Sequence, residues 1–241
     1  VVWSGGLSVA GADQGPAWST PRDLAPGPQR EQDEPSAQEL LQRLWSLKIL
    51  LISNNSIQSL QPQSLSSLEF LERLDLGHNH LKILPSDFSQ RLFSLQELRL
   101  DHNLLRLLDP SSLDDLENLR KLDLSHNQLM SLDVRVFYRL SQLTYLNLEG
   151  NKLNTLQNGL LSRQQNLQIL HLGHNNISVI KTEAFIPLRS LSLLSLHGNQ
   201  LAHIRFKTFL ELQTANTHVQ LSSNPWTCDC ELQRVLARSI T

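Results

Sequence analysis

Asparagine recurs along this chain in one fixed frame, at intervals of 24 residues over most of its length. The frame reads Leu-x-x-Leu-x-Leu-x-x-Asn-x-Leu, with isoleucine in place of leucine at some positions. Seven positions keep the spacing, and an eighth follows after 25 residues: Asn55, Asn79, Asn103, Asn127, Asn151, Asn175, Asn199 and Asn224. A self-similar period of this length predicts stacked structural repeats rather than a single globular core.

The spacing within each frame predicts how one repeat folds. The Leu-x-Leu step alternates with period two, which indicates a short strand with leucines facing inward and the intervening residues outward. One such strand cannot bury its leucines alone, so neighbouring repeats are expected to stack in parallel into a solenoid. The asparagine marks the turn after each strand, where its amide is expected to bond backbone groups that are buried without other partners.

Composition excludes several classes of function. Lysine and arginine total 21 against 23 acidic residues, so the chain lacks the strong positive charge of a phosphate-backbone binder. No apolar run reaches the length that spans a bilayer. The sequence also contains no phosphate-binding glycine loop, nucleophile elbow or zinc-binding histidine pair around a glutamate. We therefore expect no enzyme activity, no cofactor, no nucleic-acid partner and no direct membrane insertion.

The repeat frame resembles that of extracellular leucine-rich repeat proteins of the typical 24-residue class, over residues 47–226. The closing Asn224-Pro225-Trp226-Thr227-Cys228-Asp229-Cys230 resembles the start of the cysteine-rich C-terminal cap in Slit-like proteins, Toll-like receptors and neuronal leucine-rich repeat proteins. The resemblance implies a curved α/β-type horseshoe with a parallel concave sheet and an irregular convex side. It also implies an oxidising compartment, with Cys228 and Cys230 each pairing with a cysteine further along.

Four segments are expected along the chain. Residues 1–35 are rich in proline and glycine and read as a disordered leader, although Val9-Ala10-Gly11-Ala12 also resembles a signal-cleavage site. Residues 36–46 open with a capping box and predict an N-terminal capping helix. The eight-unit solenoid follows at 47–224, and residues 225–241 begin the C-terminal cap. The alternative for Cys228 and Cys230 is a zinc or redox pair, which their one-residue spacing disfavours.

Outward-facing strand residues define two candidate parts of a binding surface. In repeats two to four they alternate in charge, as Arg73, Glu97 and Lys121 in one row and Asp75, Arg99 and Asp123 in the next. This charged ladder either neutralises itself on a solvated sheet or orients a partner of complementary charge. We expect the apolar patch in repeats five to seven to bind a partner, unless it merely reflects strand propensity: Tyr145, Ile169 and Leu193, with polar Asn147, His171, Ser195 and His197.

Histidine and asparagine at the corners raise two further hypotheses. His78, His102, His126 and His174 precede a ladder asparagine, and as a column they admit a metal site or a pH-sensitive contact. Because histidine is ordinary at a solvated corner and no carboxylate is expected there, we predict no metal site. Asn54 and Asn176 each begin a glycosylation sequon, which supports secretion.

Taken together, the sequence predicts a non-enzymatic protein-recognition module, secreted or part of a receptor ectodomain, acting in adhesion, signalling or innate recognition. Its rigid concave face is expected to bind a protein ligand or co-receptor. One alternative is a cytoplasmic scaffold or enzyme regulator, which the lack of an N-terminal cysteine cap favours. A second alternative is a structural component of the extracellular matrix with weak, polyvalent binding.

Overall fold

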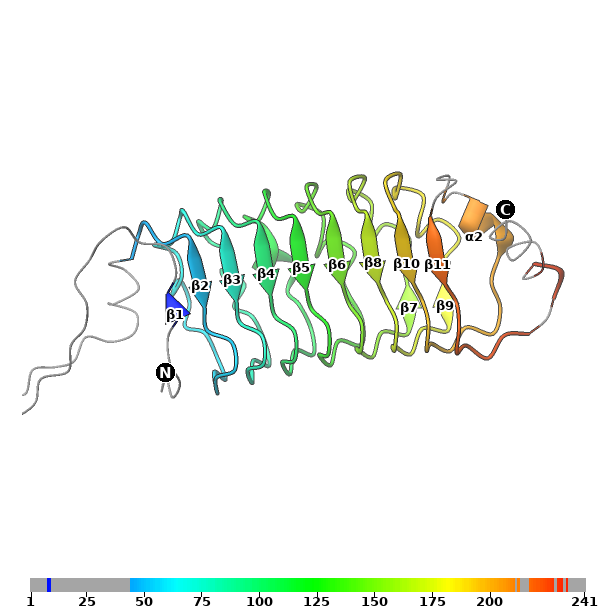
Figure 1. Cartoon of the computed structure of the whole chain (residues 1–241), viewed down its shortest axis with the longest axis horizontal. Coiled ribbons are helices and arrows are strands. Elements are labelled where there is room, and N and C mark those ends of the chain that lie inside the picture. Colours follow the sequence, from blue (N-terminus) through cyan, green and yellow to red (C-terminus); the bar gives the residue numbers. More distant parts are fainter. Residues whose placement is uncertain are drawn as a thin grey trace, which may run out of the picture.

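The computed structural model describes residues 8–9, 44–210, 212, 217–227, 229–231 and 233. These residues form a solenoid in which each repeat adds one strand to a parallel sheet along one side of the molecule (Figure 1). Irregular segments return the chain along the opposite side, and helix is scarce. The predicted fold class, a leucine-rich repeat solenoid with a parallel sheet, is confirmed.

Each strand of the main sheet is three residues long, apart from β1. The seven parallel pairings join adjacent repeats with the same register, so residues 24 apart in the first seven repeats lie side by side. The parallel strands are β2 (Ile49–Leu51), β3 (Arg73–Asp75), β4 (Glu97–Arg99), β5 (Lys121–Asp123), β6 (Tyr145–Asn147), β8 (Ile169–His171), β10 (Leu193–Ser195) and β11 (His218–Gln220).

Minor elements lie outside this stack. The short strand β1 (Ser8–Val9) pairs antiparallel with β2 at the N-terminal edge of the sheet. A second, two-stranded sheet joins β7 (Thr155–Leu156) to β9 (Val179–Ile180) in parallel. The helical elements are the 3₁₀ turn η1 (Pro110–Leu113) and α2 (Phe206–Leu210).

Leucine builds the core, as the frame predicts. The central residue of every strand from β2 to β10 has no exposed area, and the leucine two positions later is equally buried in most repeats. Phe137 and Phe185, in the segments that return between strands, are also fully buried. The apolar interior is therefore one continuous column, and each repeat closes the open face of the one before it.

The asparagine ladder connects the repeats, as predicted. The Asn127 amide donates to Leu100 O of the preceding repeat at 2.9 Å and to Leu124 O at 3.1 Å. Its carbonyl oxygen accepts from Leu105 N of the preceding repeat at 3.0 Å. The same inter-repeat acceptor bond recurs at Asn79, Asn103, Asn151, Asn175, Asn199 and Asn224. Among the described residues, the first rung, Asn55, has no donor for its Oδ1.

Most predictions for the two ends lie outside the described residues. Apart from Ser8–Val9, this holds for the leader at 1–35, and also for residues 36–43 of the expected capping helix. In the C-terminal cap, Cys228 is outside them, whereas Cys230 is an exposed free cysteine. Residues 230, 231 and 233, in the segment assigned to the C-terminal cap, are helical.

Replacing a central rung of the ladder is expected to destabilise the whole solenoid. Asn127→Ala leaves the buried N–H of Leu105 without its side-chain acceptor. It also removes one of the two amide donors to Leu100 O, which keeps its hydrogen bond from Asn103. We expect the free energy of unfolding to fall by about 1–3 kcal/mol, the penalty for buried unsatisfied groups. Urea denaturation of both proteins measures the difference. The control is Asn154→Ala at an exposed position, expected to change stability by less than about 0.5 kcal/mol; equal losses in both variants would contradict the role of the ladder.

Candidate functional site

The charged ladder lies across β3, β4 and β5 on the outer face of the sheet. The register places Arg73, Glu97 and Lys121 side by side, and likewise Asp75, Arg99 and Asp123. Arg73 Nη2 lies 3.4 Å from Glu97 Oε1, and Arg99 Nη1 lies 3.6 Å from Asp75 Oδ2. Lys121 is exposed, whereas Asp75 is buried. The charged ladder therefore presents Lys121 to solvent, whereas Asp75 is covered by its neighbours.

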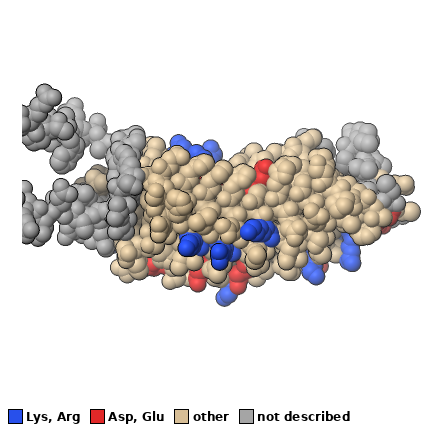
Figure 2. Space-filling view, turned by 90° about the horizontal axis from the view of Figure 1, so that it is seen from below, with Lys and Arg blue, Asp and Glu red and all other residues tan. Residues whose placement is uncertain are grey.

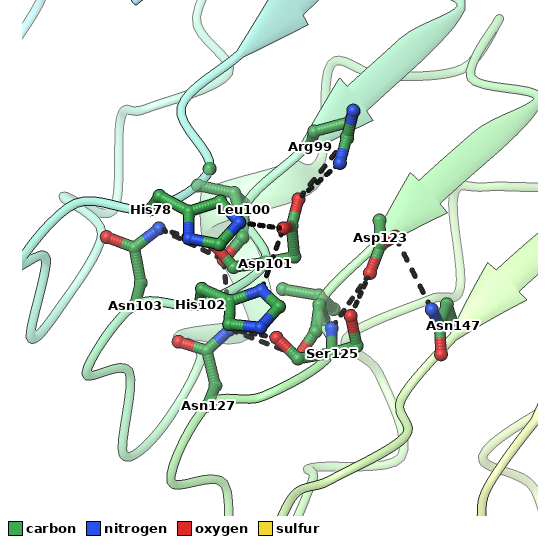
Figure 3. Close-up of polar contacts among 12 residues, drawn as sticks. His78, Arg99, Leu100, Asp101, His102, Asn103, Asp123, Ser125, Asn127 and Asn147 are labelled. Carbon is green, nitrogen blue, oxygen red and sulfur yellow. Dashed lines mark hydrogen bonds and ion pairs between the residues drawn. The ribbon is translucent and has the colours of Figure 1, made fainter. Parts of the chain in front are cut away.

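One further carboxylate, which is not a strand residue, contacts the charged ladder. Asp101, two residues beyond Arg99, is buried and lies 3.2 Å from Arg99 Nη2 (Figure 3). Partial burial by itself lowers the pKa of Arg99, but the charges of Asp101, Asp75 and Asp123 outweigh it and raise the pKa overall. The arginine is thus held by carboxylates on its own and on the neighbouring repeat.

The apolar patch lies across β6, β8 and β10. Tyr145, Ile169 and Leu193 are direct neighbours in the register and are each half-buried rather than fully exposed as expected. The Tyr145 ring contacts the edge of the His171 ring, with 5.7 Å between centroids. Asn147 is also half-buried, and its amide lies 3.4 Å from Asp123 Oδ2. This hydrogen bond links the apolar patch to the charged ladder.

The expectation that Ser195 belongs to the accessible polar rim is wrong. Its side chain has no exposed area, unlike Asn147 and His171 at the matching position of the two preceding repeats. Its hydroxyl lies 2.6 Å from Nδ1 of the half-buried His197. Ser195 therefore orients His197 and does not itself face a partner.

A hollow of about 240 Å³ lies where the two parts of the surface meet. Its lining comes from β4, β5 and β6: Glu97, Leu98, Arg99, Lys121, Asp123 and Tyr145. Burial raises the pKa of Tyr145, and the negative charge of Asp123 adds to the effect. Apart from Leu98, these residues belong to the charged ladder or to the apolar patch, and the strand register brings the two groups to one depression.

The four residues of the histidine column share one backbone conformation and make more polar contacts than expected. His78, His102, His126 and His174 all adopt left-handed backbone, with φ between 51° and 53°. The rings of His78 and His102 stack at 4.1 Å, and His102 lies 4.4 Å from His126. The expectation that no carboxylate converges here is wrong, because Asp101 Oδ2 lies 3.0 Å from His102 Nδ1 and 3.6 Å from His78 Nε2.

A second hollow, of about 460 Å³, lies among the segments that return between strands. Its lining includes Pro110, Tyr138 and Arg139. Arg163 lies over the Tyr138 ring at 4.7 Å and donates to its hydroxyl, and this hydrogen bond lowers the pKa of Tyr138. This hollow was not predictable from the repeat, because its residues do not recur with the 24-residue period.

Both sequon asparagines, Asn54 and Asn176, are exposed at the corners that follow β2 and β8. Viewed from below, the molecule shows charged side chains along one margin and a mostly uncharged surface elsewhere (Figure 2). None of the described helices has both the length and the apolar character needed to cross a membrane.

A family model described as leucine rich repeat matches residues 45–105, 93–153 and 141–201. The chain belongs to the leucine-rich repeat family. No curated protein matches it. Within this family, the repeats of the chain bring their outward strand residues onto one continuous surface, the arrangement of a protein-interaction module.

Two solved structures share the fold of this leucine-rich repeat protein. The crystal structure of the TLR13–ssRNA13 complex superposes with a TM-score of 0.73 at 28% identity, covering 77% of this chain and 26% of that one. A leucine-rich repeat protein of Leptospira interrogans, LIC12759, gives a TM-score of 0.64 at 27% identity, covering 82% and 54%. The chain thus spans about a quarter and about half of these two proteins.

The two tyrosines of the chain are expected to ionise in separate steps. The pKa of Tyr138 is lowered by its hydrogen bond from Arg163, and the pKa of Tyr145 is raised by burial and by Asp123. Near-ultraviolet absorbance should therefore show one tyrosinate step below the ordinary pKa of about 10 and one above it. Tyr138→Phe should remove the early step and Tyr145→Phe the late one. A single shared step would contradict the described surroundings of Tyr145.

Proposed function

We propose that this chain is a non-enzymatic protein-recognition module of the extracellular space, secreted or part of a receptor ectodomain. Its partner binds the outer face of the sheet, with Tyr145, Ile169 and Leu193 at the centre of the contact. The observation that carries this proposal is the in-register apolar row on a solvent-facing sheet, next to a hollow lined by charged side chains. An aromatic anchor with apolar neighbours and a polar rim is typical of protein interfaces.

The polar surroundings give the proposed interface its orientation. Asn147 and His171 flank the apolar row, and His197 lies beyond it. On the other side, the exposed Lys121 offers a positive charge, while Arg73 and Arg99 are already paired with carboxylates. We infer that the charged ladder contributes specificity through Lys121 and the hollow, and that its internal ion pairs mainly neutralise each other.

Three observations support an extracellular location. The closing Asn224-to-Cys230 segment resembles the start of an extracellular cysteine-rich cap, and this resemblance implies that Cys228 and Cys230 each pair with a cysteine further along. Asn54 and Asn176 are exposed and thus accessible to glycosylation. The similarity to TLR13 favours innate recognition among the extracellular roles. A cytoplasmic scaffold and a structural matrix component are the alternatives that the experiment below distinguishes.

Truncating the apolar row is expected to weaken binding of a natural partner. The chain is secreted from animal cells, its glycan at Asn54 and Asn176 is measured by intact mass, and it is screened against panels of purified extracellular and cytoplasmic proteins. For the tightest partner, we expect the Tyr145→Ala, Leu193→Ala double variant to raise Kd by about 100-fold, the loss of two interface anchors. Surface plasmon resonance measures both Kd values and the binding stoichiometry.

The matched control is Met130→Ala with Ile186→Ala, two exposed apolar residues outside the main sheet, which should leave Kd unchanged. Equal Kd for the Tyr145, Leu193 variant and the unmodified chain would overturn the proposed interface. A tight partner found only in the cytoplasmic panel, together with a secreted product lacking glycan, would favour the scaffold alternative. Weak binding with a stoichiometry of several partner molecules per chain would favour the structural matrix component.

A further inference from the structure

Three side chains that could ligate a metal ion converge at the corners of repeats five to seven. Glu149, His174 and His197 follow β6, β8 and β10, and each offers one ligand atom within 4.8 Å of the others. Two imidazoles and one carboxylate form a ligand set that suits zinc and similar divalent transition-metal ions. We propose that this cluster is a metal-binding site for a divalent ion of the zinc class, a role that shares only His197 with the surroundings of the proposed partner contact.

The orientation of His197 supports this role. Its Nδ1 contacts the buried Ser195 hydroxyl at 2.6 Å, which leaves Nε2 directed at the Glu149 carboxylate, 3.9 Å away. Histidines that bind metals characteristically have their second ring nitrogen fixed by such a hydrogen bond. Because Ser195 has no exposed area, this support comes from the rigid sheet rather than from a mobile surface side chain.

Two glycines make room for the two rings. A Cβ at Gly173 would lie 2.5 Å from Cε1 of His197, and a Cβ at Gly198 would lie 2.7 Å from Nδ1 of His174. Gly198 has φ +65°, but histidine takes the same left-handed backbone at the matching position of other repeats. Glycine at 198 is therefore explained by the His174 ring that lies against it, and the site is built into three consecutive repeats.

The other histidine cluster differs in the properties that matter for metal binding. His78 and His102 stack with their ring planes 10° apart, so their nitrogen lone pairs run side by side instead of converging. Asp101 contacts both rings through Oδ2 and pairs with Arg99 through Oδ1, and this positive charge opposes a bound cation. By contrast, the His174 and His197 rings meet edge to face at 87°. The proposal therefore concerns the second cluster alone.

The required adjustment is small. Zinc bonds of about 2.0–2.2 Å in tetrahedral geometry place ligating atoms about 3.4 Å apart, so the three atoms, now within 4.8 Å of one another, must close by up to about 1.4 Å. His174 is exposed and Glu149 is half-buried, and rotation about their side-chain bonds supplies this movement without displacing the sheet. Three protein ligands leave a coordination position for water.

The test is zinc titration of the chain by isothermal calorimetry at neutral pH. All proteins carry Cys228→Ser and Cys230→Ser, since thiolates bind zinc. We expect one zinc ion per chain, and Glu149→Gln or His174→Asn should each weaken affinity by more than about 100-fold. Ser195→Ala should weaken it by about 10- to 100-fold, the range for a lost supporting hydrogen bond. Cobalt absorption provides a second readout, because its visible bands report the coordination geometry.

The matched control is His102→Asn, which changes the same residue type in the same left-handed backbone beside the other carboxylate. It should leave zinc affinity unchanged, and asparagine suits this backbone in both variants. Circular dichroism verifies that every variant is folded, and Glu149→Gln tests the site without changing a corner backbone position. Zinc affinity that is undetectable in the parent, or unaffected by both ligand variants, or lost equally in His102→Asn, would overturn the proposal. Neither Glu149 nor His174 belongs to the proposed partner contact, so the two proposals fail separately.

Discussion

The hydrogen bonds of the ladder asparagines are the constraint on which the rest of this structure depends. From Asn79 onward, each amide bonds backbone groups of its own repeat and of the preceding repeat, as Asn127 does with Leu124 and Leu100. The bonds satisfy buried backbone groups at the corner, where the chain has left the sheet and no strand partner is available. They also hold successive corners at one spacing, which keeps the three-residue strands in register. A surface built from strand residues exists only because this register is kept.

The backbone conformation at the corner also determines which polar side chains lie close together. The residue before each ladder asparagine takes a left-handed backbone, and histidine, glycine, asparagine or serine occupies it in different repeats. Where histidines follow one another, as at His78, His102 and His126, their rings stack along the solenoid. Where glycine alternates with histidine, as from Gly150 to Gly198, rings cross between repeats and approach Glu149. One backbone conformation thus supports two different side-chain arrangements a few repeats apart.

Much of the fold follows from the sequence, because the 24-residue period fixes the strand, the inward leucines and the asparagine corner at once. The neighbours in the charged ladder were predictable for the same reason. The period does not specify how deeply a particular outward residue is buried, so the burial of Ser195 and Asp75 was missed. It also does not specify toward which neighbour a ring leans, so the contacts of Asp101 and the convergence at Glu149 required the structure. Asp101 directly precedes His102 in the chain, and that adjacency was the one available signal.

The most direct test of the role of the ladder is amide hydrogen exchange. It is measured at the backbone N–H groups whose hydrogen bonds the asparagine side chains accept. These N–H groups lie outside the main sheet and donate to an asparagine side chain, as Leu105 N does to Asn127 and Leu129 N does to Asn151. If the ladder holds the repeats together, both amides should exchange as slowly as the amides within β5, through cooperative opening of the solenoid. Exchange at the rate of an unprotected amide, with β5 still protected, would show that the sheet keeps its register without the ladder.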